Sequence, residues 1–273
     1  MASAIFSPDA LVGQVALVTG GGTGLGKAAA HELAACGAAV VISGRREEVL
    51  AAAAQEIGTA CSTVTGDVRE PQDAARMVDA ALERHGRLDL LLNNAGGQYY
   101  APAEMIEPKG WRAVMRLNLG GTATMCEAAA QRAMRPAGRG TIVNVTLSPH
   151  HGLTGMVHSS AARAAVEALT RELAEQWAPD GVNVIAAAAG HFATESLRKY
   201  PGPIFERAAE GIPLQRLGRE EEHAWLVALL ASPLARALSG STVTLDGARD
   251  NWFGPWPPPG LFDADDVPTE ERR

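Results

Sequence analysis

A glycine-rich turn near the amino terminus is the first feature of the sequence with the means to bind a ligand. Residues 19–26 read Thr-Gly-Gly-Gly-Thr-Gly-Leu-Gly, after an apolar run and before an alanine-rich segment. Glycines let a phosphate approach backbone N–H groups closely, and the amino end of the next helix favours an anion. The spacing departs from G-x-G-x-x-G, so a plain glycine loop is the alternative, but the setting favours dinucleotide binding. The predicted binding residues here are Gly20, Thr23, Gly24, Leu25 and Gly26.

Two arginines follow the second apolar run. Arg45 and Arg46 stand where an NAD site typically has an acidic residue for the ribose 2′-hydroxyl. A guanidinium instead suits a 2′-phosphate, with which it forms charged hydrogen bonds. Alternatively, Arg46 begins a solvated helix with Glu47 and Glu48. We predict that the cofactor is NADPH (NADP⁺), and that NADH is the poorer ligand.

Polar and small residues also follow the next two apolar runs. Asp67 is placed to accept a hydrogen bond from an adenine amino group, or else to cap the helix that begins near Pro71. Asn94 is placed to hold a strand end open beside small residues that let a cofactor pass, or else belongs to an ordinary turn. The predicted cofactor-binding residues at these two places are Asp67, Val68, Asn94, Ala95 and Gly96.

The elements that position these residues alternate between short apolar runs and longer alanine-rich helical patterns. Such alternation predicts an α/β fold: a single-domain Rossmann fold with a seven-stranded parallel, doubly wound sheet and helices on both faces. We expect strands at 14–19, 39–43, 61–65, 88–93, 141–146, 182–187 and 242–245. We expect helices at 24–36, 46–57, 71–85, 108–135, 157–177 and 220–230.

Two stretches depart from this alternation and set the expected domain organisation. Residues 1–250 form the Rossmann domain, including an irregular segment, 191–217, that is either a substrate lid or a plain surface loop. Residues 251–273 form a tail rich in proline and tryptophan, which would pack on a neighbouring subunit.

Composition and cysteine usage fit a reduced cytosolic chain, so we predict a cytoplasmic location. The net charge is −7, which gives no sign of a nucleic-acid or anionic-membrane partner. The three cysteines lie far apart without a CxxC motif, as in a reduced compartment. We see neither a signal peptide nor an apolar run of membrane-spanning length. The histidine spacing does not indicate a metal site.

Together, several motifs resemble the landmarks of the short-chain dehydrogenase/reductase superfamily. Residues 19–26, Asp67, 93–96, Asn118 and 141–144 stand in that family's order, and the likeness covers about 13–247. The resemblance implies a nicotinamide cofactor and a homotetramer (or homodimer). It also implies cofactor contacts from two residues near the sixth strand, Gly190 and Thr194.

The sequence departs from that family at its catalytic Tyr-x-x-x-Lys pair. Register from the following residues places Ser159 at the tyrosine position and Arg163 at the lysine position. Arg163 retains a positive charge for the nicotinamide ribose, which makes it both a cofactor-binding and a catalytic candidate. Ser159 is a poor proton donor to a carbonyl oxygen at neutral pH, so ordinary ketone reduction is disfavoured.

The segments 94–98, 102–104, 109–111 and 158–164 resemble the peroxisomal trans-2-enoyl-CoA reductase branch, and the related 2,4-dienoyl-CoA reductases also lack the tyrosine. This resemblance implies hydride transfer from NADPH to an enoyl or dienoyl thioester in fatty acid metabolism. The site must then hydrogen-bond an enolate oxygen and protonate a carbon. Catalytic candidates are Asn118, Ser148, Ser159, Arg163 and His158.

Each of these candidates has an alternative. Asn118 matches the family's catalytic asparagine but would otherwise bond locally inside a helix. Ser148 stands where dienoyl-CoA reductases have a tyrosine, and His158 is either a donor or a packed histidine at a helix start. Other possible donors are Tyr99, Tyr100, His150 and His151. Two further functions stay open: a carbonyl reductase or alcohol dehydrogenase with an unusual proton donor, and a non-catalytic NADP(H)-binding protein.

Overall fold

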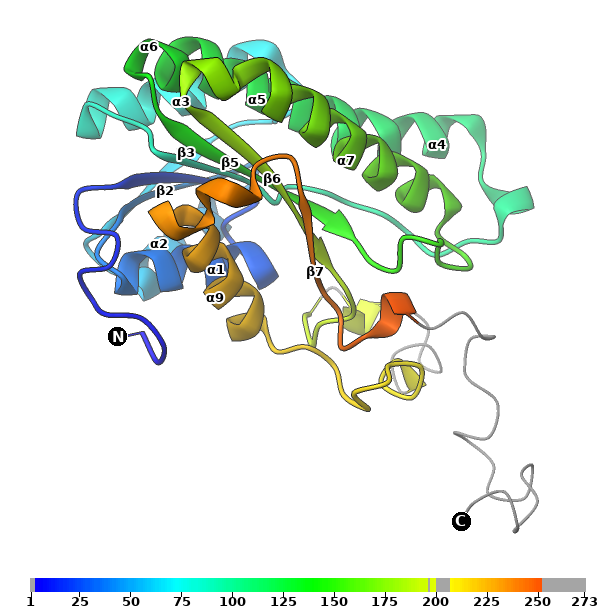
Figure 1. Cartoon of the computed structure of the whole chain (residues 1–273). Helices are drawn as coiled ribbons and strands as arrows, with labels where there is room; N and C mark the ends of the chain where they lie inside the picture. The colour runs from blue at the N-terminus through cyan, green and yellow to red at the C-terminus, as the bar shows by residue number, and fades with distance from the viewer. Residues whose placement is uncertain (1–2, 196, 200–206, 252–273) are drawn as a thin grey trace.

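The computed structural model describes residues 3–195, 197–199 and 207–251. In this part of the chain seven strands form one sheet in the order β3-β2-β1-β4-β5-β6-β7, with every neighbouring pair parallel (Figure 1). The strands are β1 Val15–Thr19, β2 Ala39–Gly44, β3 Cys61–Thr65, β4 Leu90–Asn93, β5 Gly140–Leu147, β6 Val182–Ala189 and β7 Thr242–Leu245. The predicted seven-stranded parallel sheet is confirmed.

Helices cover both faces of this sheet, as predicted (Figure 1). One face carries α1 Gly24–Ala35, α2 Glu47–Ile57 and α9 Glu220–Ala231, with α1 packed against α9. The other face carries α3 Pro71–His85, α4 Pro108–Met115, α5 Gly121–Ala129, α6 Arg135–Ala137 and α7 Val157–Trp177. Short 3₁₀ turns lie at Ala103–Met105, Ala178–Asp180, Leu197–Lys199, Pro233–Leu238 and Arg249–Asn251.

The strands are apolar at successive positions because both of their faces are covered. In β1, Leu17 packs into the cluster with α3 and α5, whereas Val18 packs into the cluster with α1 and α9. All five residues of β1 are buried. Burial on both faces explains why this strand reads as a continuous apolar run rather than as an alternating one.

The predicted helix 108–135 is continuous but not uniformly α-helical. Two π-helical segments, Arg116–Gly120 and Ala130–Met134, separate α4, α5 and α6. Apolar periodicity does not report the hydrogen-bond register within a helix, so these segments could not be predicted from it. The first contains Asn118, and π-helical turns are frequent at functional sites.

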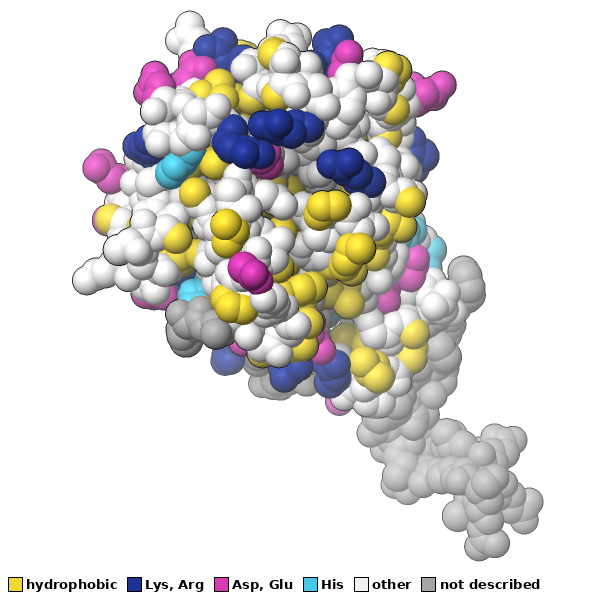
Figure 2. All heavy atoms as spheres, turned by 60° about the vertical axis from the view of Figure 1, so that its left-hand side comes forward, with side chains coloured by type: hydrophobic (Ala, Val, Ile, Leu, Met, Phe, Trp, Pro, Cys, Tyr) yellow, Lys and Arg dark blue, Asp and Glu magenta, His cyan; other side chains and the backbone are white. Residues whose placement is uncertain are grey.

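The predicted lid and tail are described only in part. In the lid, Phe192 pairs with Gly218 through an isolated bridge, which brings the two ends of that segment together. The tail from residue 252 onward lies outside the described residues, so its packing stays a prediction. Among the described residues no helix has both the length and the apolar character to span a membrane. On the face shown in Figure 2, basic and acidic side chains are scattered among apolar and neutral ones.

Candidate active site

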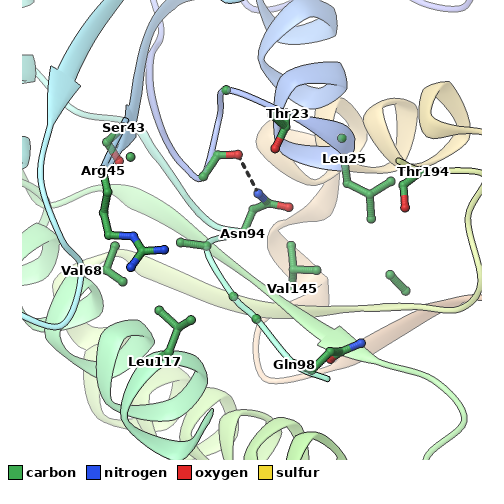
Figure 3. A pocket seen from close by; sticks show the side chains of 18 of the residues that line it. Thr23, Leu25, Ser43, Arg45, Val68, Asn94, Gln98, Leu117, Val145 and Thr194 are labelled. Carbon is green, nitrogen blue, oxygen red and sulfur yellow. Dashed lines mark hydrogen bonds between the residues drawn. The ribbon is translucent and has the colours of Figure 1, made fainter. Parts of the chain in front are cut away.

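A cleft of about 770 Å³ opens at the carboxyl ends of the strands, where β1 lies between β2 and β4. This is the point at which the strand order reverses, and open α/β sheets bind ligands there. Nearly all of the predicted cofactor-binding residues line the cleft (Figure 3): Gly20, Thr23, Gly24, Leu25, Arg45, Arg46, Asp67, Val68, Asn94, Ala95, Gly96, Arg163, Gly190 and Thr194. The exception is Gly26, which is buried behind the lining.

The glycine turn is locked to the end of β4. Asn94 Nδ2 donates to the carbonyl oxygens of Thr19 (3.0 Å) and Gly20 (3.2 Å). In return, Thr19 Oγ1 accepts from the backbone N–H groups of Asn94 and Ala95, both at 3.0 Å. A methyl group on Gly26 would overlap Asn94 Nδ2 and the Gly20 carbonyl, so only glycine fits at that position.

The amino end of α1 fits a phosphate group. Its first turn contains no acidic residue, and Thr23 at the N-cap makes no side-chain capping hydrogen bond. Gly24 has φ +52°, and a methyl group placed there would touch only Thr194, at 4.0 Å. An uncapped helix amino end that faces a cleft through glycines is suited to the pyrophosphate of a dinucleotide.

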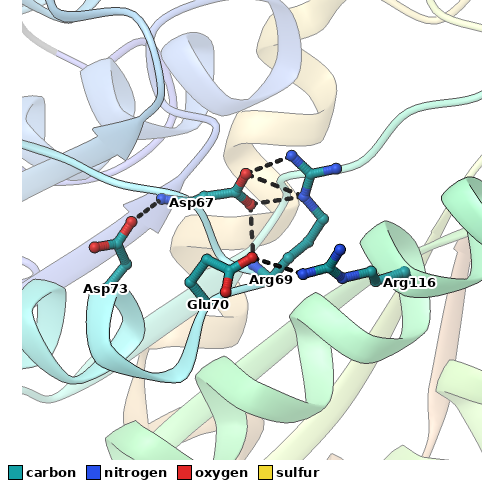
Figure 4. Close-up of polar contacts among 5 residues, drawn as sticks. All are labelled: Asp67, Arg69, Glu70, Asp73 and Arg116. Atoms are coloured by element: carbon teal, nitrogen blue, oxygen red, sulfur yellow. Dashed lines mark hydrogen bonds and ion pairs between the residues drawn. The ribbon is translucent and has the colours of Figure 1, made fainter.

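At the other end of the cleft, Arg45 and Arg46 are exposed and line the wall together with Asp67. Arg69 forms a bidentate ion pair with Asp67, with Nε 2.9 and 3.0 Å from the two carboxylate oxygens (Figure 4). This pair lowers the pKa of Asp67 to about 2, with a smaller contribution from Arg45. Asp67 is therefore charged, and Arg69 fixes the orientation of its carboxylate. Sequence reasoning missed Arg69, whose proximity depends on the loop conformation.

Arg163 reaches the cleft from α7. The guanidinium is buried, and its Nη1 donates to the carbonyl oxygen of Val145 at 2.7 Å. Burial lowers the pKa of Arg163 to about 10, so the side chain remains cationic at neutral pH. A methyl group on Gly96 would overlap this guanidinium, so Gly96 makes room for the charge beside the cleft.

Asn118 supports the cleft from behind rather than lining it. Its Oδ1 accepts from the N–H of Gly97 at 3.1 Å, and its Nδ2 donates to the carbonyls of Gly97 (2.7 Å) and Val114 (3.0 Å). The side chain is fully buried. In this geometry Asn118 positions the loop after β4.

Ser159, at the position of the family's tyrosine, is also fully buried and lies outside the cleft lining. Its hydroxyl donates to Gln98 Oε1 at 2.5 Å, and Gln98 lines the cleft. Sequence reasoning had not assigned a catalytic role to Gln98. Its only signal was its place in the segment 94–98, which resembles the enoyl-CoA reductases.

Ser148 and His150 belong to a polar network beyond the cleft lining. Ser148 is buried and donates to Asp246. The ring of His150 lies between Asp250 (Nδ1 to Oδ2, 2.5 Å) and Glu167 (Nε2 to Oε1, 3.0 Å). Burial alone lowers the pKa of His150, but the two carboxylates outweigh it, so the pKa is raised. The structure therefore does not bring these two side chains to the cleft surface.

Aromatic residues form the wall next to Gln98. The buried ring of His158 packs edge-on against Tyr99, with centroids 4.5 Å apart, and burial lowers its pKa. The hydroxyl end of Tyr99 lies against Gly110 at the start of α4, and the ring of Tyr100 lies against Gly155. Both tyrosines line the cleft, whereas His158 does not. Among the described residues no group of histidine, cysteine or acidic side chains is arranged to hold a metal ion.

A doubly wound sheet, an uncapped helix amino end and a cleft at the switch point are together typical of a dinucleotide-binding fold. Comparison with known proteins makes the class more specific. A family model described as Enoyl-(Acyl carrier protein) reductase matches residues 20–248. The chain belongs to the short-chain dehydrogenase/reductase superfamily, as its motifs suggested, and is an oxidoreductase of the kind that uses a nicotinamide cofactor.

Relatives with known names include 2,4-dienoyl-CoA reductases. The peroxisomal 2,4-dienoyl-CoA reductase of Arabidopsis thaliana is 36% identical, over 89% of this chain and 86% of its own. The corresponding protein of Danio rerio is 36% identical, over 96% of this chain and 87% of its own. Among solved structures, the citronellol catabolism dehydrogenase of Pseudomonas aeruginosa is 39% identical and has a TM-score of 0.82. That match covers 92% of this chain and 100% of the other.

Proposed function

We propose that this protein reduces a carbon–carbon double bond conjugated to an acyl thioester, of the 2-enoyl-CoA or 2,4-dienoyl-CoA type, with NADPH as the reductant. One observation carries the proposal. The dinucleotide cleft is retained, while the place of the family's phenol is taken by Ser159, which is buried and bonded to Gln98. A site without the phenol suits a reaction in which the thioester oxygen of the substrate is stabilised by a hydrogen bond and the proton goes to a carbon atom. The names of the dienoyl-CoA reductase relatives support the same substrate class.

Two arginines support NADPH as the cofactor. Arg45 and Arg46 are exposed on the cleft wall at the end of β2, where a 2′-phosphate would be held. The amino end of α1 would hold the pyrophosphate, and Thr194 and Arg163 would hold the nicotinamide half. When bound, the reduced nicotinamide supplies a hydride.

The residues of the chain must stabilise the charge that this hydride creates. The hydride adds to the carbon β or δ to the thioester, and the electron pair of the double bond moves to the thioester oxygen, giving an enolate. Bulk water then supplies a proton to a carbon of the enolate, and the hydroxide that is left is neutralised by the buffer. The substrate has then gained two hydrogens and lost one carbon–carbon double bond. Arg163 contributes a buried positive charge close to the cleft, and a charge in a buried site acts strongly because water screens it little.

A cofactor-consumption assay tests the proposal. The purified protein is mixed with NADPH and panels of 2-enoyl-CoA and 2,4-dienoyl-CoA thioesters, and the loss of absorbance at 340 nm is followed. Saturated acyl-CoAs of the same chain lengths are the controls. We expect consumption with at least one unsaturated panel and none with the saturated controls. An absence of turnover on both unsaturated panels would reject the assignment.

A second function in the same superfamily is the oxidation of an alcohol or the reduction of a carbonyl group. The 39% identity to the citronellol catabolism dehydrogenase favours it. Turnover of a terpenoid alcohol with NADP⁺ or of a 3-ketoacyl thioester with NADPH, but of no enoyl thioester, would select this function. Tight NADPH binding without turnover of any of these compounds would instead indicate a non-catalytic binding protein.

We also infer that the protein is a homotetramer, with α7 at a subunit contact. Small or apolar residues on this helix keep part of their surface exposed: Ala161, Ala165, Ala168 and Leu169. Small residues allow close helix packing, and light scattering on the purified chain would give the subunit number. The location in the cytoplasm and the role in fatty acid metabolism stay predictions from the sequence.

A further inference from the structure

Gln98 occupies a distinct place in the cleft. Gln98 and Arg45 both line the cleft, and Figure 3 shows them on opposite sides of it. Its side-chain oxygen is bonded to Ser159, which is fully buried and outside the cleft lining. The Ser159 hydroxyl is linked to the cleft lining through this hydrogen bond to Gln98.

The direction of this hydrogen bond orients the amide. An amide oxygen can only accept, so Ser159 is the donor and Gln98 Oε1 is the acceptor. The nitrogen Nε2 carries two N–H groups and is therefore the hydrogen-bond donor of the Gln98 side chain. The residue before it, Gly97, is held by two hydrogen bonds to the buried Asn118 side chain. Gln98 is thus fixed through its neighbour's backbone and through its own side chain.

We propose that Gln98 is a catalytic residue whose Nε2 donates a hydrogen bond to the thioester oxygen of the substrate, and that Ser159 is the residue that positions it. This inference rests on the proposed function. A neutral amide matches the chemistry, because the enolate oxygen must be stabilised while the proton goes to carbon. A donor that is fixed before the reaction binds the charged oxygen more strongly than the uncharged one, and this difference accelerates the step.

The substitution Gln98→Glu separates the two hydrogen bonds of this side chain. A carboxylate still accepts from Ser159 but has no N–H to donate, whereas a protonated carboxyl group has an O–H. At pH 8 we expect kcat to fall by about 100-fold with KM almost unchanged, the typical loss for one oxyanion donor. As the pH is lowered towards the pKa of the introduced carboxyl group, kcat should recover. Gln72→Glu, at an exposed position on α3, is the matched control and should behave as wild type.

Ser159→Ala tests the positioning role. This variant keeps the amide donor but frees its oxygen, so we expect kcat to fall about 5-fold, as for one neutral hydrogen bond, with a pH profile like that of wild type. The double variant with Gln98→Glu should lose little beyond Gln98→Glu alone, because the two residues act as a unit. NADPH affinity, measured by fluorescence titration, should stay within about 3-fold of wild type in all variants.

Three results would overturn the inference. The first is a Gln98→Glu enzyme with wild-type kcat at pH 8. The second is a Gln98→Glu enzyme whose kcat stays reduced by the same factor from pH 5.5 to 8. The third is a loss of NADPH affinity that parallels the loss of kcat. Either the second or the third result would mean that Gln98 only shapes the loop. These outcomes are distinct from failure of the proposed function, which would show as a wild-type enzyme that is inactive on every unsaturated thioester.

Discussion

Gly26 and Asn94 meet behind the glycine turn, where a methyl group on Gly26 would overlap the Asn94 side-chain amide. That amide donates to the carbonyls of Thr19 and Gly20 at 3.0 and 3.2 Å and so joins the end of β4 to the turn that opens α1. The shape of the glycine turn therefore depends on a contact between residues far apart in the sequence.

Gly26→Ala should disturb both binding and stability. The added methyl group displaces Asn94 and forces the turn open, an overpacking cost of about 1–3 kcal/mol. We expect NADPH affinity to fall by at least about 10-fold and the melting temperature to drop by several degrees. Gly120→Ala is the control, because its backbone is helical and the nearest atom to a new methyl group lies 3.9 Å away. NADPH titration and thermal melting check both variants, and normal binding by Gly26→Ala would contradict the packing described here.

Arg45→Asp should change the choice of cofactor. An acidic side chain repels a 2′-phosphate and accepts from a 2′-hydroxyl, so NADPH affinity should fall by roughly 10- to 100-fold while NADH affinity is kept or improved. Arg236→Asp makes the same charge change at an exposed site outside the cleft lining and should alter neither affinity. Dissociation constants for both nucleotides are the measurement. Equal losses for NADPH and NADH would show that Arg45 does not contact the 2′-phosphate.

Asn118→Ala should loosen the loop after β4. The substitution leaves the backbone groups of Gly97 without their side-chain partner in a partly buried place, which costs about 1–3 kcal/mol. We expect a lower melting temperature and a reduced kcat, because Gln98 follows directly in the chain. Asn183→Ala, on β6, serves as the control. If Asn118→Ala kept full activity and stability, the proposed support of Gln98 by this loop would be wrong.

His223 predicts a loss of stability in acid. It is fully buried and packs edge-on against Phe192, with ring centroids 5.8 Å apart. Burial lowers its pKa from 6.5 to about 4. Between these values the unfolded chain binds a proton that the folded chain does not. The fold therefore loses stability as the pH falls from about 6.5 towards 4, by up to about 3 kcal/mol in total.

The substitution His223→Met removes this proton uptake. We therefore compare the melting temperatures of the variant and the wild type at pH 5 and pH 8. The melting temperature of the variant minus that of the wild type should be more positive at pH 5 than at pH 8. Gln72→Met, at an exposed position on α3, removes no titratable group and should show the same difference at both pH values. A His223→Met difference that is the same at both values would mean that His223 does not remain neutral in the fold.

The sheet and the residues that line the glycine-turn half of the cleft could be predicted from local sequence. Strands that are buried on both faces have continuous apolar runs in their sequence. The turn after β1 requires glycine at Gly26, because any side chain there would overlap Asn94, and this requirement is visible in the sequence as a glycine motif. The ends of the strands then had to lie at one edge of the sheet, because parallel strands place their carboxyl ends together.

The surroundings of the two candidate serines depend on contacts that local sequence does not specify. Ser159 reaches Gln98 across 61 positions, and Ser148 reaches Asp246 across 98. Register alone placed both serines near the reaction, but it gave no information on where their hydroxyls point. The pairing of Asp67 with Arg69 is local, yet it depends on backbone angles in a loop that has no periodic pattern.

The fate of the hydride tests the central claim most directly. Deuterium-labelled NADPH, with the transferable hydrogen replaced, is mixed with an unsaturated acyl-CoA, and the product is examined by mass spectrometry and NMR. We predict one deuterium on the carbon β or δ to the thioester and an intact thioester carbonyl. A product that carries deuterium on a carbinol carbon, or substrate recovered without deuterium, would contradict the account.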